Sequence, residues 1–231
     1  MIETLDAWLL HKSPSGDTSA RISLLTQEKG VLNCLYKGGR TPKKQALLQP
    51  FIPLWLAVDS KKEYHFVRQI EMQRDILVLQ GNSLFAGLYV NELVFYALKP
   101  MEPCPELFAI YQQTIQGLAS LHDKLATEIL LRRFEWALLL TCGYGISFTH
   151  EAHSVMPINA QQFYQFVPEE GFVPAGTGIR GEHILALAQG QFNEVSILKT
   201  AKWIMRQAID HLLGGRELKS RKLYPRKQLG T

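Results

Sequence analysis

The sequence predicts an α+β fold in which a five-stranded barrel of the OB type precedes an all-α domain. From Leu5 to about Gln73, the apolar residues follow the two-residue period of strands, and turn-forming residues separate the runs. Beyond Gln80 they follow the helical period instead. The change of period predicts a barrel domain at residues 1–80 and a helical domain at residues 81–231.

Five short runs with strand character divide the first third of the chain. The predicted strands are residues 7–11, 20–26, 31–36, 51–58 and 64–70. Short antiparallel strands in this number suggest a partly open OB-type barrel. A five-stranded barrel of another topology remains open, because periodicity does not give the strand order.

Five later runs have the helical period. The predicted helices are residues 83–98, 106–121, 123–142, 182–189 and 193–213. Proline or glycine clusters end several of them. Residues from about 143 to 181 contain prolines and many polar residues, so we expect an irregular insert there.

Composition and charge describe an ordinary globular chain. The 231 residues are 46% hydrophobic and 20% charged, with a formal net charge of +4. The three cysteines are scattered singly and predict neither a disulfide framework nor a metal site. The N-terminus is acidic, and no apolar run reaches membrane-spanning length. We therefore expect a cytoplasmic protein with no membrane partner.

The strongest functional signal is the segment VLNCLYKGGRTPKKQALLQPFIP at residues 31–53. Its loop contains no acidic residue and four basic ones: Lys37, Arg40, Lys43 and Lys44. Gly38 and Gly39 allow the backbone to turn and to approach a ligand closely. A basic loop on a small barrel predicts binding of single-stranded nucleic acid through its phosphates.

Aromatic residues near this loop could stack on bases. Tyr36 lies at a strand end beside the glycines, so it is the best stacking candidate. Trp55, Tyr64 and Phe66 lie within the predicted strands, where a core position is favoured for most of them.

A second basic cluster lies near the C-terminus. Lys199, Lys202 and Arg206 fall at i, i+3 and i+7, so they share one face of the last predicted helix. The tail adds Arg216, Lys219, Arg221, Lys222, Arg226 and Lys227. Such a cluster attracts phosphates by counterion release. The alternative interpretation is a solvated surface with a disordered basic end.

Two adjacent arginines, Arg132 and Arg133, interrupt the apolar helical run LLRRFEWALLL. Adjacent helical positions point about 100° apart, so at least one arginine should lie at the edge of a groove. A groove lined by leucine and rimmed by arginine suits an acidic peptide with an apolar end. The alternative is an internal ion pair with Glu128 or Glu135.

The remaining motifs give little support for catalysis. GTGIRG at residues 176–181 matches the dinucleotide fingerprint only formally, so a turn is expected there. His150 and His153 lack the further ligands of a closed zinc site, and we expect no metal. With Glu151 they are the only assembled polar candidates for an enzyme site.

Five motifs spread along the chain resemble the RecO family of bacterial recombination mediators. They are LYKGGR at residues 35–40, LQPF at 48–51, GLYVNEL at 87–93, LRRFEWALLLTCGYGISF at 131–148 and GGRELKSRKL at 214–223. The resemblance implies an OB-fold followed by a helical domain. It also implies a bacterial, nucleoid-associated protein that uses no cofactor and catalyses no covalent step.

For function, the resemblance implies binding to single- and double-stranded DNA and annealing of complementary strands. It further implies that the protein works with RecR to load RecA onto DNA coated by single-strand binding protein. The residues that match the family's DNA-contact motifs are Lys37, Arg40, Lys219 and Arg221. Arg132 and Arg133 become candidates for gripping the acidic C-terminal tail of the single-strand binding protein.

One departure from the family pattern concerns zinc. Many members carry two Cys-x-x-Cys pairs after the Gly-Tyr pair that stands at residues 143–144 in this chain. This chain has neither cysteine pair, which indicates that it resembles the zinc-free branch of the family. An RNA-binding OB module in translation or ribosome assembly remains the alternative function. It would share the barrel and the charge, but not the leucine–arginine groove.

Overall fold

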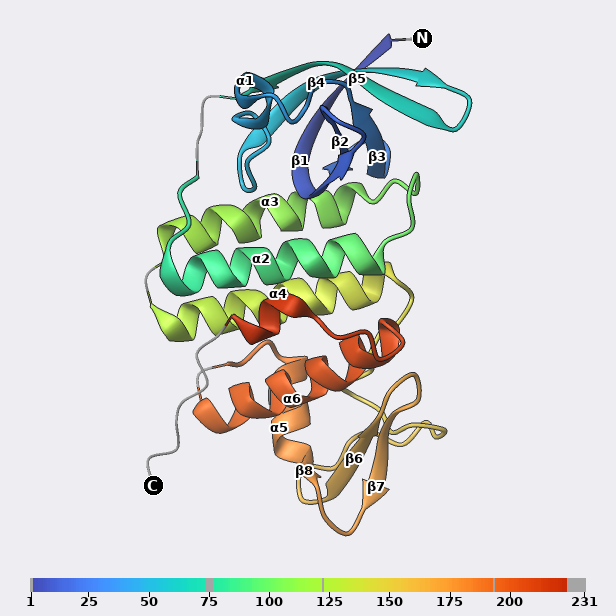
Figure 1. Ribbon diagram of the computed structural model, residues 1–231. Coiled ribbons are helices and arrows are strands. Elements are labelled where there is room, and N and C mark those ends of the chain that lie inside the picture. The colour runs from blue at the N-terminus through green and yellow to red at the C-terminus, as the bar shows by residue number, and fades with distance from the viewer. Residues whose placement is uncertain (1, 74–76, 122, 193, 224–231) are drawn as a thin grey trace. The chain divides into compact units, whose positions relative to one another are not determined.

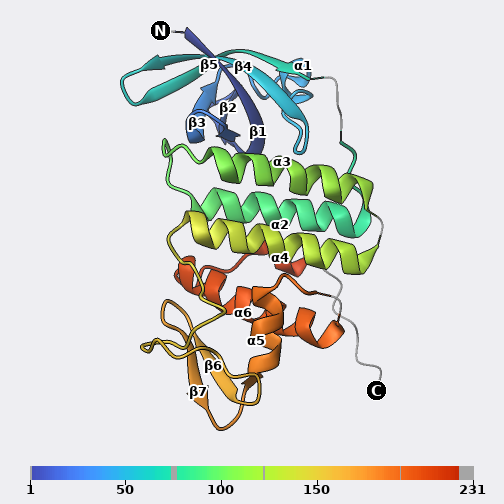
Figure 2. The same ribbon diagram turned by 180° about the vertical axis from the view of Figure 1, so that it is seen from behind.

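The computed structural model describes residues 2–73, 77–121, 123–192 and 194–223. The chain packs as two compact units (Figures 1 and 2). Unit 1 contains Met1–Thr127 together with Leu218–Thr231, and unit 2 contains Glu128–Glu217. Among the described helices, none is both long and apolar enough to cross a membrane.

The first half of unit 1 is the predicted five-stranded barrel, and it is closed rather than partly open. Its strands are β1 (Ile2–Ser15), β2 (Ser19–Thr26), β3 (Gly30–Tyr36), β4 (Pro53–Lys61) and β5 (Tyr64–Met72). They follow the order β1-β2-β3-β5-β4, and β4 pairs again with β1. Only β3 and β5 pair in parallel. Periodicity alone could not give this order.

Strand β1 closes the barrel because it is long enough to pair with two neighbours. Residues 2–8 pair with β4, and residues 7–15 pair with β2. The register shifts between Leu9 and His11, which marks a β-bulge that bends the strand from one partner to the other. The sequence prediction of residues 7–11 captured only the centre of this strand.

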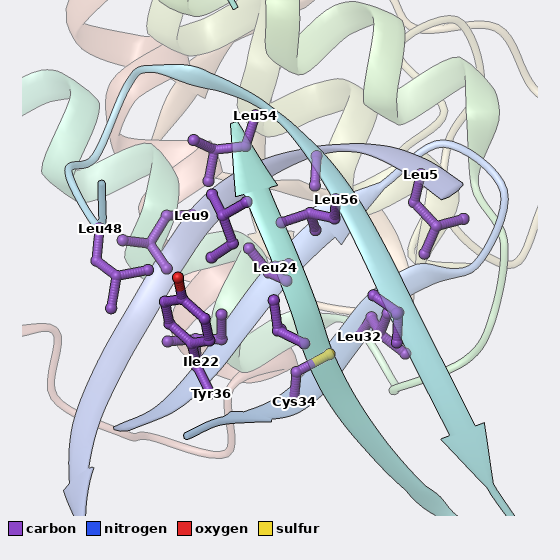
Figure 3. Close-up of a cluster of buried hydrophobic side chains, with 14 of the residues drawn as sticks. Leu5, Leu9, Ile22, Leu24, Leu32, Cys34, Tyr36, Leu48, Leu54 and Leu56 are labelled. Atoms are coloured by element: carbon purple, nitrogen blue, oxygen red, sulfur yellow. The ribbon is translucent and has the colours of Figure 1, made fainter. Parts of the chain in front are cut away.

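The barrel is filled by inward-facing side chains at alternate strand positions (Figure 3). Leu24, Leu32, Leu54 and Leu56 are fully buried at its centre. Tyr36 belongs to the same cluster, at the end of β3.

Two helices of unit 1 pack against the barrel: α2 (Gly81–Ala97) and α3 (Pro105–Ser120). Asn91 of α2 donates its Nδ2–H to the carbonyl oxygen of Leu9 in β1 at 3.1 Å. Tyr111 of α3 donates its hydroxyl to Asn91 Oδ1 at 2.6 Å, and its ring packs edge-on against Trp8. The predicted domain boundary at residue 80 therefore lies within unit 1, between β5 and α2, and it stays a prediction.

Unit 2 contains most of α4 (Lys124–Thr141), all of α5 (Gly181–Ala188) and α6 (Val195–Leu212), and a small sheet. The sheet has the order β7-β6-β8, formed by β6 (Phe163–Val167), β7 (Gly171–Ala175) and β8 (Ile179–Arg180). This corrects the prediction that residues 143–181 are irregular. Two-residue periodicity does not reveal these strands, because β6 is apolar at four of its five positions, Pro174 interrupts β7 and β8 has two residues.

Candidate nucleic-acid interface

The predicted phosphate-binding loop leaves β3 through a tight turn and enters a single helical turn, α1 (Pro42–Gln45). The amide of Gly39 donates to the Tyr36 carbonyl oxygen at 3.1 Å. A Cβ atom at Gly39 would lie 2.9 Å from Tyr36 Cδ1 and 3.1 Å from Ala20 Cβ. Glycine is therefore required at this position by close packing rather than by its φ angle.

Two of the four basic loop residues hold the loop in place. Arg40 donates from Nη1 to the carbonyl oxygens of Gly16 and Asp17, at 3.0 and 3.1 Å, and so fastens the loop to the β1–β2 turn. Lys44 Nζ donates to the Lys37 carbonyl oxygen at 2.8 Å and lies 4.8 Å from the centre of the Tyr36 ring. Both side chains therefore have structural partners within unit 1.

The other two basic residues, Lys37 and Lys43, are exposed. Lys37 Nζ lies 6.0 Å from the centre of the Phe66 ring on β5. Within the described ranges, neither ammonium group forms an ion pair. Lys37 and Lys43 are thus the loop cations that can approach a phosphate without giving up an ion pair with a described residue.

Tyr36 does not lie where the sequence analysis expected it. Its side chain is 3% exposed, and burial raises the pKa of its hydroxyl. It occupies the inward register of β3, two residues after Cys34 and four after Leu32. A ring buried this deeply has no exposed face on which a base can stack, so Tyr36 is not part of the candidate interface.

Two aromatic residues of β5, Tyr64 and Phe66, are available instead. Tyr64 is 71% exposed, and Phe66 is half-buried beside Lys37. The sequence favoured core positions for most of Trp55, Tyr64 and Phe66, without deciding which of them face outward. The signal that could have found them is register, because Val67 points inward and its neighbour Phe66 therefore points outward.

The basic tail begins in η1 (Lys219–Lys222), a short 3-10 helix that Glu92 of α2 holds. The Glu92 carboxylate accepts hydrogen bonds from the amides of Lys219 and Ser220, at 2.9 and 2.8 Å, and also from the Ser220 hydroxyl. The Arg221 guanidinium lies 6.0 Å from the ring centre of Tyr89. Arg226 and Lys227, which complete the predicted basic cluster, lie outside the described residues.

In unit 2, α6 presents Lys199, Lys202 and Arg206 on its exposed side. Lys202 Nζ pairs with Glu128 Oε1 at 2.7 Å, and Arg206 Nε lies 3.8 Å from Asp210 Oδ2. Lys199 forms no ion pair with any described residue. The predicted DNA contacts thus form three groups: the loop of residues 37–44, η1 and α6.

The two arginines of α4 have different environments. Arg132 is buried, and its Nη2 donates to Glu135 Oε1 at 2.7 Å, which is one of the two alternatives that the sequence left open. Arg133 is exposed. It shares a helical face with half-buried Ala137 and exposed Leu140, at i+4 and i+7. Arg133, rather than Arg132, is therefore available to a partner.

The polar residues considered for catalysis have separate partners. His150 Nδ1 lies 2.9 Å from Thr149 Oγ1, and His153 Nε2 lies 2.8 Å from Glu170 Oε2. Glu151 accepts a hydrogen bond from the Tyr164 hydroxyl at 3.1 Å. The GTGIRG segment includes β8 of the antiparallel sheet, which differs from the parallel βαβ unit that a dinucleotide site needs.

Comparisons with known proteins agree along the whole chain. The family described as "Recombination protein O N terminal" matches residues 1–75, and "Recombination protein O C terminal" matches residues 79–222. A DNA repair protein RecO of Legionella pneumophila (strain Corby) is 54% identical over 223 residues, which cover 96% of this chain and 97% of the relative. A DNA repair protein RecO of Tolumonas auensis is 38% identical and covers 94% of this chain and 93% of the relative.

Proposed function

This chain belongs to the RecO family of DNA repair proteins, and we propose that within DNA repair it acts as a recombination mediator. In this proposal it binds single- and double-stranded DNA, anneals complementary strands and, with RecR, helps to load RecA onto DNA coated by single-strand binding protein. It catalyses no covalent step, in keeping with the separate partners of His150, Glu151 and His153.

The observation that carries the DNA-binding part is the basic loop on the closed barrel. Lys37 and Lys43 are exposed at its surface, and Arg40 and Lys44 fix its conformation. Cations held by a rigid scaffold bind a phosphate backbone with less loss of conformational entropy than cations on a mobile segment. The exposed ring of Tyr64 and the half-buried ring of Phe66, both on β5, add stacking surfaces for unpaired bases.

The face of α4 supports the partner-binding part. Arg133, Ala137 and Leu140 place one guanidinium beside apolar surface on a single helical face. An acidic tail with an apolar end would pair a carboxylate with Arg133 and bury its apolar group against Leu140. We propose this face as the binding site for the C-terminal tail of the single-strand binding protein.

A strand-annealing assay tests the proposal directly. Complementary DNA strands are mixed with the protein, first bare and then coated with single-strand binding protein. We expect faster annealing in both cases, since a mediator must act on the coated strand. Annealing no faster than in buffer would contradict the proposal. Binding to RNA oligonucleotides with no binding to DNA would favour the RNA-binding alternative instead.

A further inference from the structure

Helix α6 exposes a large aromatic side chain, that of Trp203, in the middle of its basic side. Trp203 is 46% exposed, which makes it the most exposed of the four tryptophans; Trp8 is buried, and Trp55 and Trp136 are half-buried. The opposite side of α6 carries its apolar contacts, through Ile197, Ala201, Ile204, Met205 and Ala208. Packing of α6 therefore does not require an indole at position 203.

Two cations, Lys199 and Arg206, lie one turn from Trp203 on the surface of α6, and Asp210 lies 3.8 Å from Arg206 Nε. Lys199 precedes it by four residues and Arg206 follows it by three, so all three side chains share one face. Lys199 and Arg206 are separated by about 10 Å along the helix axis. Lys202 is adjacent, although Glu128 offsets its charge. We call Lys199, Lys202, Trp203 and Arg206 the α6 face.

The combination of an indole ring and cations on the α6 face favours an unpaired DNA strand as the ligand. A purely apolar partner would gain nothing from the lysine and arginine side chains. An acidic peptide would use the cations, but it would use the ring only through an apolar group such as the one at the end of the tail proposed for α4. An unpaired strand of DNA presents both a polyanionic backbone and planar bases, which bind a basic surface and stack on an aromatic ring.

We propose that Trp203 stacks on a base of single-stranded DNA while Lys199 and Arg206 bind the flanking phosphates. The proposal rests on the DNA-binding function proposed above and deepens it, because it identifies a residue that distinguishes unpaired DNA from duplex DNA. In a duplex the bases are already stacked on each other, so no base face is exposed for Trp203 to stack on. The cations can still contact duplex phosphates.

The test compares Trp203→Ala and Trp203→Phe with the parent protein in fluorescence-anisotropy titrations. The probes are a labelled oligothymidine, an abasic oligomer of the same length and a DNA duplex. The matched control is Val195→Ala, another exposed apolar residue of α6. Circular dichroism and thermal unfolding establish that each variant remains folded.

We expect Trp203→Ala to weaken oligothymidine binding at least about five-fold, the lower end of the range for one base–aromatic stack. Trp203→Phe should retain most of the affinity, because phenylalanine still offers a ring. The abasic oligomer and the duplex should bind the alanine variant and the parent equally well. Val195→Ala should match the parent on all three probes.

Three results would overturn the proposal. Trp203→Ala could bind oligothymidine as the parent does, or lose affinity for the abasic oligomer by the same factor, or lose binding of an acidic peptide while DNA binding is unchanged. A parent protein that binds no single-stranded DNA is a different failure. That result would overturn the proposed function itself, and this inference with it.

Discussion

Arg132 and Glu135 form an ion pair in α4, with 2.7 Å between Nη2 and Oε1, and both side chains are at most 5% exposed. The two residues lie one turn apart on the same helix. A buried ion pair contributes little net stability compared with apolar residues of similar size. Loss of one partner, however, leaves a charge in an environment that cannot solvate it.

We therefore predict that Arg132→Ala destabilises the protein by about 3–5 kcal/mol, because it removes the ion-pair partner at Oε1 of the buried Glu135 carboxylate. Arg133→Ala is the matched control, and its exposed position predicts a change within about 0.5 kcal/mol. Urea unfolding followed by circular dichroism measures both. The double variant Arg132→Met, Glu135→Leu should recover most of the loss. Equal midpoints for the two alanine variants would show that the ion pair has no structural role.

A second prediction concerns the same two arginines in partner binding. Arg133→Ala should weaken binding of an acidic peptide from the single-strand binding protein tail by about 1.5–3 kcal/mol, the range for a hydrogen bond to a charged group. DNA binding in the absence of the partner should change little. Isothermal calorimetry gives the affinity, with Lys124→Ala as a control for loss of one exposed cation from α4. An Arg133→Ala variant that binds the peptide like the parent would place the site elsewhere.

The third prediction uses the contacts of Glu92. Its carboxylate accepts three hydrogen bonds from Lys219 and Ser220, so Glu92→Ala should release η1 from α2. Trypsin should then cleave after Lys219, Arg221 or Lys222 faster than in the parent, since proteases need a locally unfolded segment. Glu106→Ala on α3 serves as the control for loss of an exposed carboxylate. Equal cleavage rates in the two variants would show that Glu92 does not hold the segment.

The fourth prediction concerns Cys34 inside the barrel. Burial raises the pKa of this thiol to about 12, so at pH 8 only about one molecule in 10,000 carries the reactive thiolate. A variant with Cys104→Ser and Cys142→Ser retains Cys34 alone. Its alkylation by iodoacetamide should be negligible in the folded state and rapid in urea. Fast labelling of the folded variant at pH 8 would contradict the barrel packing.

Much of the fold could be predicted because long helices contain several repeats of the helical spacing of apolar residues. The helix predicted at residues 123–142, for example, is observed at Lys124–Thr141. The sheet of β6, β7 and β8 could not be predicted, because β6 does not alternate between apolar and polar residues, Pro174 interrupts β7 and β8 has two residues. The order of the barrel strands depends on pairing between distant segments, which local patterns do not encode.

The candidate interface was predicted as a segment but not residue by residue. Four cations in an acid-free loop identify residues 37–44. The sequence does not reveal that the side chains of Arg40 and Lys44 donate hydrogen bonds to backbone carbonyl oxygens. Tyr36 was misplaced because a strand-end residue can face either way, and the burial of Leu32 and Cys34 decides the register. Trp203 was overlooked because a single tryptophan in a helix carries no periodic signal.

The proposed function depends most on binding of single-stranded DNA by the barrel loop through Lys37 and Lys43. The most direct measurement is the affinity of the Lys37→Ala, Lys43→Ala variant for oligothymidine across a series of salt concentrations. The control is Lys99→Ala, Lys124→Ala, which removes the same charge from exposed positions outside the loop. We predict weaker binding of the loop variant, with a slope of log affinity against log salt that is shallower by about 0.7 for each lost phosphate contact. The control should keep the parent slope. If the loop variant keeps the affinity and slope of the parent, the loop is not part of the interface, and the proposal that the barrel binds DNA through this loop is wrong.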